Sequence, residues 1–532
     1  MEKYIVQNIK LPIDSSEEEV FSEAKKKLSK HFSKKNIKSL EIYKTSIDAR
    51  KKDHICFVYS VIAEISERAN AKALALDGIA VMTDDKMEIR YGDNQLVDRP
   101  VIVGFGPCGM FCALLLAQHG YRPLVIERGS GVEKRTQDVD RFTKFGILDP
   151  ESNIQFGAGG AGTFSDGKLV TRINDPKCGY VLEEMHRLGA PEEILRKAKP
   201  HIGTDYLKLV VKQMEEKIKS LGGDVLYDTR LEDIVCTNGA VSYIKTNAGD
   251  IPCGALILAL GHSARDTFSM LRGRGITMIP KPFSVGVRIE HLQEDIDYAL
   301  YGKSAGHPKL PQGEYNLSCH HGDRGVYTFC MCPGGQVVGA ASENGGVVTN
   351  GMSNFARDGK NANSAVAVSV NPSDYGDTVE HAIAFQRNLE QRAFIAGGKN
   401  YYAPCETVGD FLKKTAHSEP ARIQPTYRDG KVTMTSMDTV LPEFVAESLR
   451  FGLVNFDKKI KGFAADDAVI TGIETRTSSP IRIPRNDNYL APGFSNVYPC
   501  GEGAGYAGGI TSAAVDGIKC ALAIMEKYKQ LN

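Results

Sequence analysis

The sequence predicts an α/β protein: a Rossmann-like nucleotide-binding domain built from separate stretches of chain, a β-rich domain inserted into it, and a ferredoxin-like α+β module before it. Three observations predict this arrangement. A glycine fingerprint, GFGPCG at 104–109, lies between a buried strand and a helix. A second strand, glycine loop and helix follow one another at 496–528. Residues 281–455, rich in glycine, asparagine and β-prone runs, are too long to be one loop.

Length and composition limit what the protein can be. At 532 residues the chain is too long for one hydrophobic core, so two or three domains are expected. The formal net charge is zero, so no overall field attracts the protein to nucleic acid or anionic lipid. We find no apolar run near the ~18 residues of a membrane helix, and the N-terminus lacks a signal-peptide core. A cytoplasmic protein without a membrane partner is therefore expected.

Residues 1–95 predict the ferredoxin-like module. A helix is expected to begin after Ser16, which can cap it, and apolar residues from Val20 onward recur at helical spacing. The other expected elements are strands at 4–9, 39–47, 54–65 and 87–91 and a helix at 71–76. This β-α-β-β-α-β order is that of a ferredoxin-like fold.

Lysines are dense between residues 25 and 38, and 50–52 are Arg-Lys-Lys. They indicate either a nucleic-acid patch or a solvated helix face. Glutamates at 17–19 and 23 share the helix, and no aromatic residues are interleaved to stack on bases. We therefore expect no nucleic-acid partner.

The nucleotide-binding domain is expected in two parts, 96–280 and 456–532, around the insertion at 281–455. Its first part begins with strand 100–103, helix 108–119 and strand 124–127, and residues 130–175 are read as loop-rich. The remaining expected elements are a helix at 206–221, strands at 225–227, 231–236 and 240–246, and a buried strand at 255–260.

Each glycine of the fingerprint has a structural role. Gly104 permits a tight turn, Gly106 lets the backbone approach a pyrophosphate, and Gly109 allows close packing of helix on strand. Pro107 and Cys108 begin the helix, whose N–H groups and dipole favour phosphate. At the end of the next strand, Glu127 can accept from ribose hydroxyls and disfavours a 2′-phosphate, and Arg128 follows it.

Two further stretches distinguish a flavin from a nicotinamide nucleotide. The loop at 157–163 exposes backbone N–H groups beside a pyrophosphate and ring, and Glu502 can accept from ribityl hydroxyls. The helix starting near 509–511 would direct its N–H groups at the pyrimidine edge of a flavin, which gains negative charge on reduction. The expected cofactor contacts in these two stretches and at three positions outside them (Lys168, Leu231 and Gly261) are Gly159, Gly160, Ala161, Gly162, Thr163, Lys168, Leu231, Gly261, Gly501, Glu502, Gly508, Gly509 and Ile510.

These segments, with the strand end Ala259-Leu260-Gly261, resemble the glutathione-reductase-like class of FAD enzymes, in which Asp usually stands where this chain has Glu502. Nearly the whole chain resembles the FAD-dependent, or NAD(FAD)-utilising, dehydrogenases. The matching stretches are SIDAR at 46–50, FSDGKL at 164–169, GHSARD at 261–266, CMCPGG at 330–335 and ETRTSSP at 474–480. The resemblance implies FAD but no particular substrate. With one GxGxxG, a nicotinamide nucleotide would dock only transiently at the flavin face, as electron donor.

The candidate catalytic residues are Cys330, Cys332, Arg357 and His262. Residues 327–332 and 336–341 read as a hairpin that turns both cysteines to one face, as a redox dithiol or as structural cysteines. Cys319, His320 and His321 could join them around a metal, but the spacing fits no zinc signature, so no metal is expected. His262 is a proton donor or a capping residue. Arg265, Arg288 and Arg476 could bind a substrate carboxylate or pair with Asp266, Glu290 or Glu474.

The function expected is FAD-dependent oxidoreduction, with hydride exchanged between flavin N5 and a small organic substrate held between the FAD-binding and inserted domains. Three alternatives stay open: a flavoprotein acting on RNA through the N-terminal lysines, a flavin-bound assembly protein without activity, and a flavin-dependent monooxygenase. Substrate, electron donor and oligomeric state leave no signal in the sequence.

Overall fold

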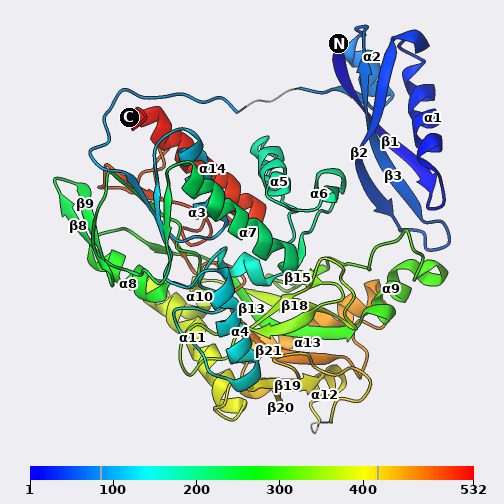
Figure 1. The fold of residues 1–532 in the computed structure, drawn as a ribbon. Coiled ribbons are helices and arrows are strands. Elements are labelled where there is room, and N and C mark those ends of the chain that lie inside the picture. The colour runs from blue at the N-terminus through cyan, green and yellow to red at the C-terminus, as the bar shows by residue number, and fades with distance from the viewer. Residues whose placement is uncertain (84–86, 416–417, 532) are drawn as a thin grey trace.

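The computed structural model describes residues 1–83, 87–415 and 418–531. The N-terminal module stands to one side of the molecule, with α1 on the face turned away from the remainder (Figure 1). Its strands pair antiparallel in the order β2-β3-β1-β4, which is the ferredoxin-like arrangement. Its elements are β1 Glu2–Pro12, α1 Glu17–Leu28, β2 Ile37–Asp48, β3 Cys56–Ile65, α2 Ala71–Leu76 and β4 Ile79–Val81.

Two details of this module were tested by the structure. The capping prediction is confirmed, because Ser16 Oγ accepts from the Glu19 backbone and the Glu19 carboxylate accepts from Ser16 N–H. The strand predicted at 87–91 is wrong, since β4 follows α2 directly. Met87 and Ile89 instead pack as coil against the core of the next domain, where Gly92 N–H donates to Met525 O at 2.8 Å. The alternation of apolar and polar residues at 87–91 therefore reflects this packing and not a strand.

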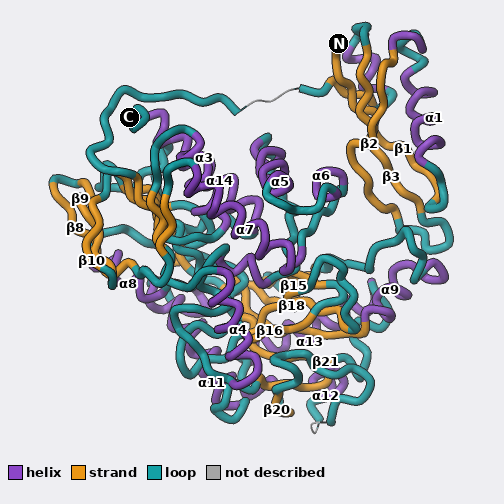
Figure 2. Tube along the Cα trace, viewed as in Figure 1, coloured by secondary structure: helices purple, strands orange, loops and turns teal. Residues whose placement is uncertain are grey.

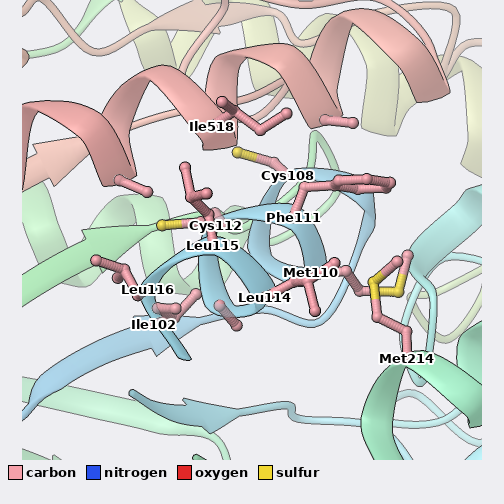
Figure 3. Packing of buried hydrophobic residues seen from close by; sticks show 14 of the residues in the cluster. Ile102, Cys108, Met110, Phe111, Cys112, Leu114, Leu115, Leu116, Met214 and Ile518 are labelled. Atoms are coloured by element: carbon pink, nitrogen blue, oxygen red, sulfur yellow. The ribbon is translucent and has the colours of Figure 1, made fainter. Parts of the chain in front are cut away.

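A five-stranded parallel sheet forms the second unit, in the order β23-β11-β5-β6-β7. Helices α3, α7 and α14 cover one face, and the meander β8-β9-β10 packs on the other. Figure 3 shows Cys108, Phe111 and Ile518 packed where α3 meets α14. The bounds are β5 Pro100–Val103, α3 Pro107–Gln118, β6 Leu124–Ile126, α7 Gly203–Ser220, β7 Asp224–Leu226, β8 Leu231–Thr237, β9 Ala240–Thr246, β10 Gly249–Pro252, β11 Ala255–Leu258, β23 Val497–Pro499 and α14 Ile510–Lys527.

The segment read as loop-rich at 130–175 contains helix α4, Val132–Phe145, which was not predicted. The buried positions of α4 are Arg135, Asp138, Val139 and Phe142, which have helical spacing. Two of these four are charged, so a pattern of apolar residues did not mark the helix. Arg135 is fully buried because its guanidinium donates to the carbonyls of Asn153, Ala158 and Ile154. Helices α5, Lys177–Arg187, and α6, Glu193–Arg196, were also not predicted.

The inserted unit is built on a seven-stranded sheet in the order β14-β15-β18-β13-β21-β19-β20, with helices α11 and α13 packed on it. It lies below the parallel sheet in Figure 2. Because β21 belongs to this sheet, the boundary predicted at 455 divides it. The bounds are β13 Phe283–Leu292, β14 Ser318–His321, β15 Arg324–Cys332, β18 Asn361–Val370, α11 Val379–Ala396, β19 Ala403–Thr407, β20 Val432–Met434, α13 Glu443–Lys459 and β21 Val469–Glu474.

The hairpin predicted between 327–332 and 336–341 is wrong. Strand β16, Gln336–Gly339, pairs with β17, Thr349–Met352, while β15 pairs with β14 and β18. Val338 of β16 is buried against Val139 of α4, which draws that strand away from β15. The shorter elements are α8 Arg265–Gly273, β12 Ile279–Pro280, α9 Gln293–Tyr301, α10 Pro372–Tyr375, α12 Val408–Lys413 and β22 Ile481–Arg482. Among the described residues, no helix has the length and apolar character needed to cross a membrane.

Candidate FAD site

Four glycine-containing stretches, distant in sequence, meet at the carboxyl ends of β5, β11 and β23. Gly159 N–H donates to Phe105 O at 2.8 Å, which joins the loop at 157–163 to the fingerprint. A Cβ on Gly503 would lie 2.3 Å from Gly261 O, so the third stretch touches the fourth. Ligands of open α/β sheets bind at this edge. The structure therefore brings the four glycine-containing stretches together.

The glycines fall into two groups by what surrounds them. A Cβ on Gly104, where φ is +106°, would lie 2.3 Å from Ala259 O, and one on Gly109 would lie 2.0 Å from Gly104 O. These two glycines allow protein to pack on protein. At Gly261 and Gly508, by contrast, a Cβ would have no neighbour within 4 Å. We call the open strip the cradle; it comprises Gly106, Gly261, Gly508 and Gly509.

Two helix N-termini open into the cradle. Neither Gly106, the N-cap of α3, nor Gly509, the N-cap of α14, provides a side-chain hydrogen bond to its helix. The first N–H groups of both helices are therefore left to bind an anion or a polar ring edge. Gly160, Ala161, Gly162 and Thr163 form a short 3-10 turn beside them, and Gly162 lies against Ile510.

Glu127 has a second role that the sequence did not predict. Its carboxylate accepts three backbone N–H groups: Phe105 at 2.8 Å, Gly129 at 3.0 Å and Gly157 at 2.9 Å. Glu127 thus ties the fingerprint to the glycine loop at 157–163. A carboxylate has about four lone-pair positions, so one is left for a ribose hydroxyl, which stays a prediction.

Three other residues that were predicted to contact the cofactor contact other protein groups instead. Arg128 forms ion pairs with Glu151 and Asp266 and lies 4.2 Å over the Phe156 ring. Lys168 Nζ lies 2.9 Å from Glu314. Leu231 is buried among apolar residues on the meander side of the sheet. These residues shape the site rather than offering free groups to a ligand.

Glu502 is the charged residue of the glycine-containing stretch at 501–509. It is half-buried, and although its backbone carbonyl accepts from Gly505 N–H, no group in the described part of the chain donates a hydrogen bond to its carboxylate. Burial raises the pKa of Glu502 to about 7, and its nearest charged or titratable neighbours are Lys281 and Cys330. An acceptor without a protein donor fits the hydroxyls of a ribityl chain.

The raised pKa predicts how stability depends on pH. A carboxyl whose pKa rises from 4.5 to about 7 on folding contributes stability below pH 4.5 and loses it as pH increases through 7. In the FAD-free protein, the free energy of unfolding should therefore fall less between pH 5 and pH 8 for Glu502→Gln than for wild type. Glu443→Gln, an exposed glutamate of α13, should follow wild type. Equal slopes for Glu502→Gln and wild type would contradict the assignment.

A buried ion-pair cluster connects the cradle to the inserted unit. Asp166 is fully buried and accepts from Arg357 Nε at 2.9 Å and from Ser353. Although burial favours the neutral acid, Lys168 and Lys199 lower the pKa of Glu314 to about 2. Because Arg357 is paired with Asp166, its guanidinium is not free to act on a substrate. Its predicted catalytic role becomes one of holding the loop that carries Lys168.

The two candidate cysteines lie close to this cluster. Cys330 has φ +47° at an irregularity in β15, and Arg288 donates to its carbonyl at 3.0 Å. A hydrogen bond from the Cys332 thiol lowers the pKa of Cys330 to about 7, while the pKa of Cys332 rises well above its usual value. Both are free thiols, and Cys332 is buried. The strand irregularity, absent from the predicted hairpin, makes the two cysteines inequivalent.

His262 lies elsewhere, beside the ion pairs of Arg265 and Arg476 with Glu390. Burial and the two arginines lower the pKa of His262 to about 3, so it is neutral at physiological pH. A neutral imidazole bonded to Ser263 Oγ at 2.9 Å is a poor proton donor. The structure does not bring His262 to the Cys330 group, and the proton-donor interpretation is not supported.

The three arginines considered as substrate clamps are all paired internally. Each pairs with an acid distant in sequence and not with the nearby one that was considered: Arg288 pairs with Glu474, and Arg265 and Arg476 share Glu390. The metal ligands considered around Cys319 also do not come together among the described residues. Among the described residues, the three ligand groups close enough to share an ion are Cys108, Cys500 and Asp516. Lys281 and Glu314 were missed because no local pattern marks them.

Two family models and one full-length relative match this chain. A family model described as "FAD-dependent protein, C-terminal domain-like" matches residues 282–477, and one described as "Domain of unknown function (DUF8436)" matches residues 2–64. An "Uncharacterized protein" of Clostridium beijerinckii is 47% identical over 532 residues, covering 98% of each chain. The chain belongs to the family of that protein. The first match supports FAD as the predicted cofactor, and its limits place β21 with the inserted sheet.

Two solved structures are also similar in part. CtdE in complex with FAD is 13% identical, covering 80% of this chain and 83% of its own, with a TM-score of 0.32. L-proline dehydrogenase from P. horikoshii is 12% identical, covering 82% and 96%, with a TM-score of 0.34. Likenesses this distant say nothing about what this chain binds or converts.

Proposed function

We propose that the protein is an FAD-dependent oxidoreductase that transfers hydride between flavin N5 and a small organic substrate. The observation that carries the proposal is the cradle: two helix N-termini without side-chain caps and the open glycines lie near Glu502, whose carboxylate has no donor among the described residues. FAD supplies, when bound, a two-electron acceptor and donor. Residues of this chain would bind the cofactor and move the proton.

Binding is divided among the stretches that converge. The helix N-terminus that begins at Gly106 would bind the pyrophosphate through backbone N–H groups, and Glu127 would accept from the ribose. Glu502 would accept from the ribityl hydroxyls. The N-terminus of α14, at Gly509 and Ile510, would stabilise negative charge at the pyrimidine edge. No cationic side chain is needed for the pyrophosphate, which accords with the internal pairing of Arg128 and Lys168.

Cys330 is the group proposed to move a proton. Its thiol is close enough to Glu502 for the two charges to interact, and it titrates near neutral pH with Cys332 as hydrogen-bond donor. A thiolate at this position can accept the proton that a substrate N–H or O–H loses as its carbon gives up hydride. Arg288 and the Asp166–Arg357 pair position the surrounding backbone. His262 has no part in this scheme.

An anaerobic titration tests the proposal. The purified full chain is reconstituted with FAD and titrated separately with NADH, NADPH and panels of amino and hydroxy acids. We expect a bound flavin band that at least one donor bleaches. Cys330→Ser should retain the band but be reduced about 100-fold more slowly by that donor. Cys319→Ser, a partly buried thiol of β14, should match wild type.

Two outcomes would contradict the assignment. A protein that stays colourless after reconstitution does not use the cradle for FAD. Rapid oxygen consumption that requires NADPH and hydroxylates the substrate would indicate a monooxygenase instead.

A further inference from the structure

Two buried thiols lie in contact directly behind the cradle. Cys108 is the second residue of α3, and Cys500 follows β23 and precedes Gly501. They are 392 positions apart in sequence, yet their sulfurs are 2.9 Å apart. Cys500 is fully buried and Cys108 nearly so. The two sulfurs therefore come into contact only when the chain folds.

Close backbone packing holds the two thiols in place. A Cβ on Gly501, where φ is +74°, would lie 2.8 Å from the Cys108 Cβ. On α14, a Cβ at Gly517 would lie 2.1 Å from Cys108 O. Side chains at either glycine would push α3 and α14 apart. Figure 3 shows the Cys108 side chain at this crossing. The sulfurs are thus confined by glycines on both sides.

A shared metal ion does not account for the arrangement. Asp516 is the third group near the two sulfurs, but its carboxylate is already engaged. It accepts from Arg485 at 2.6 and 2.9 Å and from Gly501 N–H at 2.7 Å. The Arg485 guanidinium would repel a cation placed beside it. A structural zinc site would also need four free ligands.

We propose that Cys108 and Cys500 form a reversible intrachain disulfide that fastens the first turn of α3 to the loop carrying Glu502. Disulfide sulfurs are about 2.05 Å apart, so the pair must close by less than about 1 Å. The oxidant is a low-molecular-weight disulfide. Its S–S bond breaks, a Cys108–Cys500 S–S bond forms, and the two thiol protons leave on two released small thiols. Two electrons pass from the protein to the oxidant.

The surroundings predict slow exchange and a stable product. Burial raises the pKa of Cys108 to about 12, so little thiolate is present to attack. Oxidation should be slower than at the exposed Cys236. Once formed, the bond closes a loop of nearly 400 residues, and this restricts the unfolded chain more than a short loop would. The oxidised protein should therefore melt at a higher temperature than the reduced one.

The full chain is incubated with oxidised glutathione, alkylated with iodoacetamide and digested without reductant. We expect one cross-linked peptide pair joining Cys108 to Cys500, lost on treatment with dithiothreitol, and a rise of several degrees in Tm on oxidation. In Cys500→Ala the cross-link and the rise should both be absent, whereas Cys253→Ala, which changes a buried thiol elsewhere, should retain them. Cys108→Ser provides a second variant if Cys500→Ala does not fold.

The proposal fails if prolonged oxidation leaves both cysteines alkylated, or if Cys500 pairs with Cys520 instead. It also fails if the purified protein holds one equivalent of zinc that Cys108→Ser loses. These readouts are masses, metal content and Tm, so they are independent of flavin binding and of activity.

Discussion

Gly106→Val should abolish FAD binding while leaving the fold intact. The φ of Gly106 is −83°, which any residue adopts, and the nearest atom to an added Cβ is Gly160 Cα at 3.7 Å. The added Cβ makes an ordinary contact with the protein, and the rest of the valine side chain fills the space in which a pyrophosphate must approach the helix. We expect FAD affinity to fall at least about 100-fold, equivalent to about 2.8 kcal/mol.

Two matched variants make the comparison specific. Gly179→Val introduces the same side chain at an exposed glycine of α5 that has no neighbour within 4 Å, and it should bind FAD as wild type does. Gly109→Ala should instead destabilise the protein, because its Cβ would lie 2.0 Å from Gly104 O. Far-ultraviolet circular dichroism reports the fold, and flavin fluorescence in a titration reports binding. Normal FAD affinity in Gly106→Val would place the cofactor elsewhere.

Arg288→Met should be the most destabilising substitution in the inserted unit. Arg288 is fully buried, pairs with Glu474 at 3.1 Å and donates to Asn363 at 2.9 Å and to Cys330 O at 3.0 Å. Removing the guanidinium leaves the Glu474 carboxylate charged and without its partner in the core. Breaking such a pair costs about 3–5 kcal/mol.

Urea unfolding of a double-mutant cycle measures this cost. Combining Arg288→Met with Glu474→Gln removes the stranded charge, so the double variant should lose less stability than the sum of the two single variants. Arg392→Met, at an exposed arginine of α11, should change stability by no more than about 0.5 kcal/mol. If the two single effects add, the ion pair does not stabilise the fold in this way.

Local patterns in the sequence determined much of the fold. The strand at 100–103, the helix at 71–76 and the capping box at Ser16 are found as expected, because each depends on neighbours within a few residues. Patterns failed where packing partners were remote. The alternation at 87–91 reflects packing on another domain, and the helix at 132–145 buries Arg135 through loop carbonyls.

The cofactor site shows the same division. Glycine spacing marked the stretches that line the cradle, since a glycine needed for close approach is visible in the sequence itself. Which glycines face protein and which face open space was decided by the tertiary structure. So was the second role of Glu127, whose carboxylate binds backbone from two loops.

What the sequence alone determined is therefore the elements that local patterns mark and the likeness to FAD-dependent proteins. Tertiary structure decided the partners: Arg357 with Asp166, Arg288 with Glu474, Cys330 beside Glu502, and Cys108 against Cys500. The physical reason is the distance along the sequence over which each kind of interaction acts. Periodicity and turn chemistry report the conformation and burial of a residue, whereas an ion pair or a thiol contact depends on chain segments that meet only when the sheets assemble.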